Sequence, residues 1–457
     1  MNKVIAFIKG NLIVVISVVL ILALLPTGYV FASKWNAKVQ TKVKDAYNGE
    51  KTRLNSRGRV NYALPAVLEG EADITETRAP NDRVTEFYKQ AKEARIAQVN
   101  EVVERGEAFN KGTHVELVPG LLPDAGDARS RQRLGRTMSE AIVGTLDEPS
   151  VYQSKLQRLN AGSPPDPEVL AQTLEQAKAQ REQDLKGNNP DGNLTDEQRK
   201  QLEEEMTSRR LSAYIGRAKS LTFYCSTDAF VNATSSDGAT TVSREGYSVI
   251  PAVNWSPSQI TESVAFTWLW DYWIISDILD AAALANTNAA SGAMSILEAP
   301  VKRIDLIRIS ALEVDQGTAA TDDPGGGRFG GRGATDDPVA GVAADATITG
   351  RQPGQPNSPY DIRTVELVAV VSSKDLPRFI DALGKVNFMT VLDLDLQAVD
   401  IWEELKQGYY YGDDHVVRVA MTIESVWLRS WLAPLMPDPV KQTLGIPVAQ
   451  NTQDPEG

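Results

Sequence analysis

The feature that most constrains this chain is a run of 24 residues without a charged side chain, Gly10–Ser33. As an α-helix such a run measures about 36 Å, enough to cross the roughly 30 Å hydrocarbon core of a bilayer. Tyr29 and Trp35 lie near its far end, where amphipathic aromatic rings favour the membrane interface. The run therefore predicts a transmembrane anchor, preceded by a short cytoplasmic N-terminus at residues 1–9.

A cleaved signal peptide is the alternative interpretation of this run. Its densest apolar part, Leu12–Leu25, has the length of a signal-peptide core, and Val30-Phe31-Ala32 resembles a small-residue cleavage site. We favour the uncleaved anchor because the uncharged run is long and continues into a helical pattern. Lysines flank both ends of the run, so the positive-inside rule is ambiguous. Both interpretations place the bulk of the chain outside the cytoplasm.

The composition restricts the functions open to this chain of 457 residues. A net charge of −13 argues against nucleic-acid binding, which requires a basic surface. The single cysteine, Cys225, excludes an intramolecular disulfide and a cysteine metal cluster, and its apolar neighbours predict a buried thiol. The two histidines, His114 and His415, lack the spacing of a metal site. We predict no catalytic residues, no metal, no cofactor and no small-molecule substrate.

Between the anchor and residue 220 the chain is highly charged, and its pattern predicts mostly helix. In Lys34–Leu54 a narrow stripe of Trp35, Val39, Val43 and Tyr47 indicates a short coiled-coil seam or, alternatively, an isolated stalk helix. Four further helices are expected, at Asp82–Phe109, Val151–Leu159, Pro167–Leu185 and Leu194–Ile215.

The aromatic segment Phe266–Ile275 is open to functional interpretation. Its helical spacing gives one thick apolar face, and the aspartates in and after it exclude a membrane span. Trp268 and Trp273 are candidate residues of a partner interface, because exposed tryptophans often dominate binding. The same helix could instead form the wall of a ligand pocket. We favour a third interpretation, a core helix, because the spacing suits simple packing.

A strand–helix–strand unit at Thr364–Asp400 has a well-defined core side. A β-branched strand is followed by a helix with one apolar stripe and by a strand in which alternate leucines share a face. Lys374 and Arg378 are expected to be exposed on the helix and are candidate interface residues. The residues expected in the core are Phe379, Leu383, Leu394 and Val419.

The last 200 residues show six expected elements in the order αββαββ. They are a helix at Thr261–Asn286, strands at Val301–Val314 and Arg363–Ser372, a helix at Asp375–Lys385, and strands at Met389–Val399 and His415–Leu428. This order predicts an α+β fold with a ferredoxin-like two-layer domain. The expected domains are the anchor at 10–33, the charged helical region at 34–220, the ferredoxin-like domain at 221–436 with a Gly- and Asp-rich insertion at 316–359, and a peripheral Pro-rich tail at 437–457.

These features together resemble the inner-membrane alignment proteins of type IV pilus machines, the PilO kind, and of type II secretion systems, the GspM kind. The local match runs from Val365-Glu366-Leu367-Val368-Ala369-Val370-Val371 to the helix Leu376–Leu383. The resemblance covers the anchor and Val301–Leu428, whereas the large Asn55–Ser220 region and the insertion depart from the family pattern.

The resemblance implies a non-enzymatic, membrane-anchored scaffold that links inner-membrane and periplasmic components. It also implies homo- or heterodimers and a partner of similar shape, a PilN-like or GspL-like membrane protein. The sequence leaves open an extracytoplasmic ligand-binding or sensory module, and a hydrolase is less favoured because two histidines force no catalytic arrangement.

Overall fold

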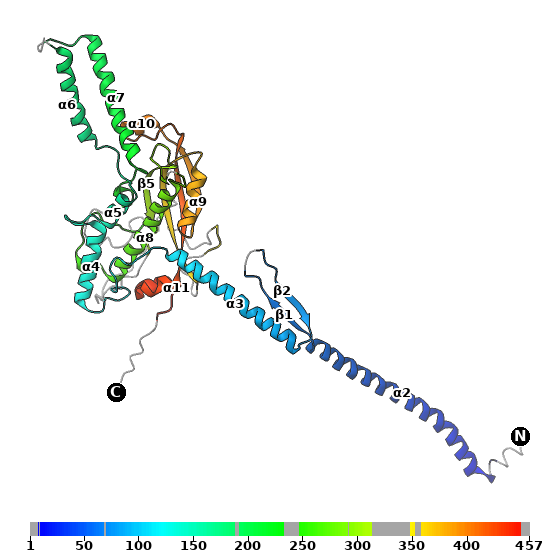
Figure 1. The fold of residues 1–457 in the computed structure, drawn as a ribbon. Coiled ribbons are helices and arrows are strands. Elements are labelled where there is room, and N and C mark those ends of the chain that lie inside the picture. The colour runs from blue at the N-terminus through cyan, green and yellow to red at the C-terminus, as the bar shows by residue number, and fades with distance from the viewer. Residues whose placement is uncertain are drawn as a thin grey trace, which may run out of the picture. The chain divides into compact units, whose positions relative to one another are not determined.

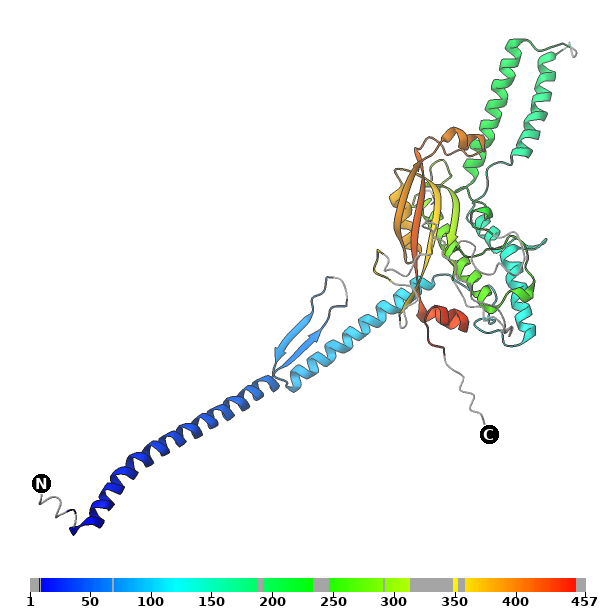
Figure 2. The same cartoon turned by 180° about the vertical axis from the view of Figure 1, so that it is seen from behind.

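The computed structural model describes residues 8, 10–67, 70–187, 192–232, 246–290, 292–312, 348–351 and 358–448. These residues are a mixture of helices and strands, and the chain divides into two compact units, Met1–Arg105 and Gly106–Gly457 (Figures 1 and 2). The expected insertion at 316–359 lies almost entirely outside the described residues. The expected boundary at residue 220 does not separate the two units, because helices from residue 128 onward share the core of the C-terminal sheet.

The first unit begins with α2, a helix of 46 residues spanning Leu12–Arg57. The expected anchor and the expected stalk helix are therefore one continuous helix. Its apolar part is long enough to cross a membrane, and none of that window is buried against the rest of the described chain. A core helix of a soluble domain would be mostly buried, so these exposed apolar side chains need another apolar environment.

A β-hairpin that the sequence analysis did not predict follows α2. Strand β1 (Val60–Leu64) pairs antiparallel with β2 (Ile74–Arg78). Tyr62 of β1 stacks on Tyr88 of helix α3 (Asp82–Lys111), with ring centroids 4.5 Å apart. An isolated two-stranded hairpin is marginal in water, so its packing on α3 is what makes it stable.

Helices account for the first part of the second unit. Its long helices are α4 (Ala128–Val143), α5 (Val151–Arg158), α6 (Pro167–Lys186), α7 (Asp196–Ser220) and α8 (Glu262–Ala285). Helices α6 and α7 form a projecting antiparallel hairpin (Figure 1). Helix α4 was not predicted; its buried Leu134, Met138 and Ile142 recur every four residues but are surrounded by charged and small side chains. The short elements of this part are η1 (Thr227–Ala229), η3 (Pro257–Gln259), β3 (Thr287–Asn288) and β4 (Gly292–Ala293).

A four-stranded antiparallel sheet forms the centre of the second unit. Its strands are β5 (Val301–Ile309), β6 (Tyr360–Ser372), β7 (Met389–Ala398) and β8 (Val416–Leu428). They lie in the order β5-β6-β8-β7, so β8 inserts between the two strands that helix α9 (Leu376–Val386) connects. Rows of apolar residues run across the strands; in one row Ile307 pairs with Leu367, Leu367 with Met421, and Met421 with Leu394.

Helices α8 and α9 pack on each other and on the sheet face that carries these apolar rows. Phe379, Leu383 and Val419 are fully buried, as expected. Leu394 is 36% exposed, so its expected place in the core is wrong. The reason is the strand order: β7 is an edge strand, and an edge strand has a neighbouring strand on one side only.

A buried ion pair crosses this core. The guanidinium of Arg363, on β6, donates to the Asp271 carboxylate of α8 at 2.8 Å, and both side chains are at most 2% exposed. The same nitrogen donates to Ser248 Oγ at 3.0 Å and to the Ser310 carbonyl at 2.7 Å. Burial raises the pKa of Asp271, while the charge and hydrogen bond of Arg363 act in the opposite direction. The pair fixes the position of α8 over the sheet.

Short helices complete the chain: α10 (Ile401–Lys406), α11 (Arg429–Leu432), η4 (Ala433–Leu435) and α12 (Asp438–Thr443). Val440 and Leu444 are buried in the main core, so the first part of the expected peripheral tail belongs to the folded unit. Arg429 ties this segment to β6 through two hydrogen bonds to Asp361. The remainder of the tail, from residue 449, lies outside the described residues.

Candidate functional site

The two tryptophans proposed for a partner interface lie in the core of the second unit. Trp268 is 3% exposed and Trp273 is 1% exposed, so neither side chain is available to a partner. Trp268 packs edge-on against Trp255, and the Trp273 indole N–H donates to the Val115 carbonyl at 3.1 Å. Helix α8 is buried on nearly all sides, since helices and the sheet enclose it, and this corrects the interface interpretation.

The two basic candidates of the interface are at the surface. Lys374 lies in the turn before α9 rather than on the helix, and its ammonium pairs with Asp414 at 2.6 Å. That contact raises the pKa of Lys374. Arg378, in the first turn of α9, donates to the Thr287 carbonyl at 2.5 Å. Both side chains therefore have internal partners, and a role in binding stays a prediction.

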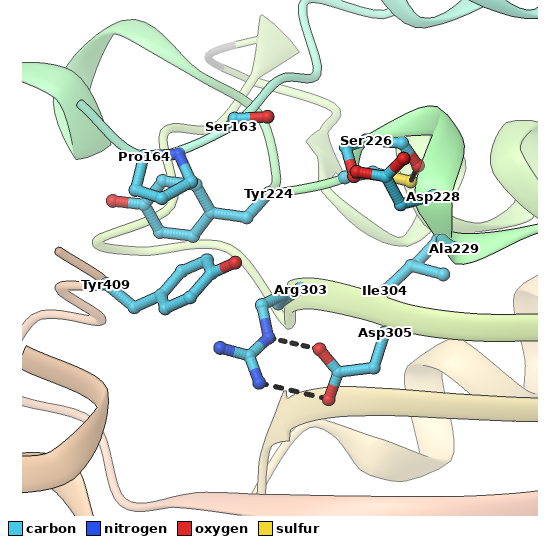
Figure 3. A pocket seen from close by; sticks show the side chains of 11 residues that line it. Ser163, Pro164, Tyr224, Ser226, Asp228, Ala229, Arg303, Ile304, Asp305 and Tyr409 are labelled. Carbon is cyan, nitrogen blue, oxygen red and sulfur yellow. Dashed lines mark hydrogen bonds and ion pairs between the residues drawn. The ribbon is translucent and has the colours of Figure 1, made fainter. Parts of the chain in front are cut away.

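A concave site lies beside strand β5, a cavity of about 260 Å³ (Figure 3). Four segments build it: the loop before α6, the stretch from Tyr224 through η1, strand β5, and the loop after α10. Tyr224 extends the sheet at this edge, because its N–H donates to the Lys302 carbonyl at 2.8 Å and its carbonyl accepts from the Ile304 N–H at 2.9 Å. The lining residues are Ser163, Pro164, Tyr224, Cys225, Ser226, Asp228, Ala229, Arg303, Ile304, Asp305 and Tyr409.

A charge-balanced cluster of two arginines and two carboxylates lies at the cavity wall. Arg303 forms two hydrogen bonds to Asp305 and two to Glu404 of α10. Arg418 of β8 donates to Glu404 at 3.0 Å and is paired with Asp305 at 3.3 Å. The Arg303 guanidinium also lies over the ring of Tyr409, 4.1 Å from its centroid. Every charge in this cluster is thus neutralised by another within it.

The pKa shifts around the cavity follow from burial and these contacts. Burial disfavours the charge on Arg303, but its hydrogen bonds to Asp305 and Glu404 outweigh burial and raise its pKa. Burial also raises the pKa of Cys225 and raises the pKa of Tyr224 to about 12. Cys225 and Tyr224 are therefore protonated at neutral pH and do not serve as nucleophile or base there.

The arrangement is suited to joining chain segments. Each guanidinium nitrogen of Arg303 donates to an internal carboxylate, so Arg303 has no free donor fork to offer an anion, and a neutral thiol is a poor metal ligand. Within the described residues, no group of three or more His, Cys, Asp and Glu side chains could hold a metal ion. The cluster holds α10 and its following loop against β5 and β8.

A second polar cluster lies where α3, α8 and the end of β8 meet. His114 Nε2 is 2.8 Å from the Asp277 carboxylate, and the Asn387 amide donates to the same carboxylate at 2.7 Å. Asn110 donates to the Asn387 side chain at 2.8 Å and accepts from the Trp431 indole at 2.8 Å. The histidine ring is surrounded by tryptophans at 5.2–6.0 Å between centroids: Trp273, Trp427 and Trp431. These bonds fasten the last turn of α3 to the core.

Neither cluster was predicted from the sequence. One signal was present for the first, since Arg303 and Asp305 are two residues apart on a strand and thus share a face. No local pattern pointed to Glu404, which follows Arg303 by 101 residues. The sequence around His114 indicates only an ordinary histidine, and its buried tryptophan surroundings come from the tertiary fold alone.

In comparisons with known proteins, no family model, no curated protein and no solved structure matched this chain.

Proposed function

We propose that this protein is a non-enzymatic, membrane-anchored scaffold, of the kind found in type IV pilus or type II secretion machines. The observation that carries the proposal is helix α2, which continues from an apolar, unburied membrane-length segment directly into an exposed stalk. A continuous helix transmits position from the membrane to the far end of the stalk, because its backbone is hydrogen-bonded along its length except at Pro26, which has no N–H to donate. The bulk of the chain would lie on the extracytoplasmic side.

The stalk part of α2 supports pairing with a second helix. Trp35, Val39, Val43 and Tyr47 are between 47% and 75% exposed and recur every four residues along one face. An exposed apolar stripe on a helix favours association with another helix, which removes the stripe from water. Two chains anchored in one membrane present their stalks in parallel, so a second copy or a similar membrane protein meets this stripe in register.

We also infer a ferredoxin-like arrangement for the α8–β8 part of the second unit. The support is the strand order β5-β6-β8-β7 together with two helices on one face of the sheet. This order is what a circularly permuted βαββαβ chain produces, with α9 linking β6 and β7, which are not neighbours in the sheet. Domains of this kind offer sheet edges and helix faces to partners such as a PilN-like or GspL-like protein.

The structure removes the main support for the ligand-binding alternative. It depended on the tryptophans of α8 as a pocket wall, and those side chains fill the core. The cavity beside β5 remains, but Arg303 and Asp305 at its wall are paired with each other, and Arg303 is also paired with Glu404.

Cysteine cross-linking in membranes tests the scaffold proposal. Val39→Cys and Val43→Cys lie on the stripe, and we expect each to form a disulfide between stalks on mild oxidation. Cys225 is the single native cysteine and is 3% exposed, so background reaction should be low. Thr41→Cys is the matched control, because two residues on a helix turn about 200° and place it on the opposite face.

The result to expect is a cross-linked species from the two stripe positions and little from Thr41→Cys. Mass spectrometry then distinguishes a second copy from a different membrane protein. Equal yields at all three positions would indicate random collision, and no product at any position would contradict pairing through the stalk.

A further inference from the structure

The open edge of the sheet has a recognisable pattern of side chains. Strand β7 is ten residues long, contains neither proline nor glycine, and ends the sheet. No backbone hydrogen bond among the described residues joins its outer edge to another segment. The opposite edge is different: Tyr224 and Ser248 both form backbone hydrogen bonds to β5 and block it. An unpaired edge offers a row of N–H and C=O groups to an incoming strand.

On one face of β7, Leu394 and Leu396 extend the apolar rows of the core to the edge. Leu394 pairs with Met421 and Leu396 with Val419, both of which are buried. Yet Leu394 is 36% exposed and Leu396 is 53% exposed. A further strand would cover them with apolar side chains of its own, since directly opposite residues lie on the same face.

On the other face, β7 presents two carboxylates, Asp393 and Asp395. They pair across the sheet with Thr422 and Ala420, which bring no charge. Their hydrogen-bond partners are the Leu394 amide at 2.9 Å and the Gln397 side chain at 3.3 Å, and no cation within the described residues forms an ion pair with either. A strand added here would place its own Cβ atoms about 4.5–5.5 Å from the Cβ atoms of the two aspartates.

These charges decide which strand fits. In the antiparallel self-pairing centred on Leu394, Asp393 of each copy would lie opposite Asp395 of the other, and like charges opposite each other destabilise a pair. A strand with lysine or arginine at alternate positions would instead meet both aspartates with opposite charge. Beyond the end of β7, helix α10 exposes Trp402 (75%) and Ile401 (50%), which add apolar surface of the kind that anchors binding.

We propose that the β7 edge binds a β-strand of another protein, in which basic residues alternate with apolar ones. The basic residues face Asp393 and Asp395, and the apolar residues cover Leu394 and Leu396. This form of recognition adds a strand to an existing sheet: the main chain gives affinity and the alternating side chains give specificity. The inference rests on the scaffold function, for which it names the chemistry of one partner.

Hydrogen exchange of the full chain in lipid nanodiscs tests the proposal with a defined probe. The probe is a synthetic β-hairpin with an Asn-Gly turn, whose outer strand alternates lysine with valine; the matched control replaces each lysine with glutamate. We expect the lysine hairpin to slow exchange of the β7 amides and to bind about tenfold more tightly than the glutamate hairpin, since two cross-strand charge pairs change sign between them. The double variant Asp393→Lys/Asp395→Lys should reverse this preference.

Three results would overturn the inference. The first is that neither hairpin protects β7, and the second is that both protect it equally. The third is that Asp393→Asn/Asp395→Asn makes the chain self-associate without weakening the binding of the lysine hairpin. The last result would mean that the aspartates only prevent edge-to-edge pairing. None of these results bears on the stalk cross-links, so the edge inference and the scaffold proposal fail separately.

Discussion

Replacing Arg363 with methionine should destabilise the second unit by about 3–5 kcal/mol. The substitution leaves the Asp271 carboxylate, which is 0% exposed, buried without its cation. That amount is a large part of the roughly 5–15 kcal/mol by which domains are usually stable. Urea unfolding followed by tryptophan fluorescence measures it, because six of the eight tryptophans of the chain are buried in this unit.

The pH dependence of this loss identifies its cause. Burial already raises the pKa of Asp271, and without Arg363 the pKa should rise further. The folded variant then binds a proton more readily than the unfolded chain, so its stability falls as pH rises above the ordinary aspartate pKa of about 3.9. We expect the free energy of unfolding of Arg363→Met to be closer to that of the native chain at pH 5 than at pH 8.

A double variant, Arg363→Met/Asp271→Leu, is the control. Apolar replacement of a whole buried ion pair is often neutral, so most of the lost stability should return and its pH dependence should disappear. If the double variant is as unstable as Arg363→Met and keeps its pH dependence, the unpaired carboxylate is not the cause.

Phe379→Ala should cost about 3–5 kcal/mol, because it removes a fully buried ring and leaves a cavity between α9 and the sheet. The protein should accumulate poorly in cells, because this loss is a large part of the usual stability of a domain. Denaturant unfolding of the purified variant gives the free energy directly.

Leu394→Ala tests whether Leu394 lies at the exposed edge of the sheet and not in the core, by comparison with Phe379→Ala. Leu394 is on the apolar face but 36% exposed, so truncation leaves no enclosed cavity and should cost less than about 1 kcal/mol. A loss near that of Phe379→Ala would show that something covers the β7 edge in the folded chain.

Local pattern predicted the elements of the C-terminal sheet closely. The strand expected at Met389–Val399 is β7 at Met389–Ala398, and the helix expected at Thr261–Asn286 is α8 at Glu262–Ala285 with Thr261 as its N-cap. Alternation and helical spacing are properties of neighbouring residues, so they can be recognised directly in the sequence. The same information could not tell that Leu394 is on an edge, because strand order depends on pairing between distant segments.

The candidate sites show the same limit. Glu404 and Arg303 meet only because α10 packs beside β5, and Asn110 reaches Asn387 across 277 positions of sequence. Trp268 and Trp273 have the composition of a binding surface, and only the surrounding helices and sheet show that they fill the core. The β1–β2 hairpin was missed because its strands are short and half exposed, so their alternation is weak.

Reporter fusions at two positions test the central claim, a single anchor with the bulk of the chain outside the cytoplasm. A phosphatase that is active only outside the cytoplasm is joined after Asn100 in one fusion and after Gly457 in the other. Only one helix among the described residues is long and apolar enough to span, so both fusions should be active and both should remain in the membrane fraction. An inactive fusion at either position, with a cytoplasmic reporter active there instead, would contradict the anchored scaffold.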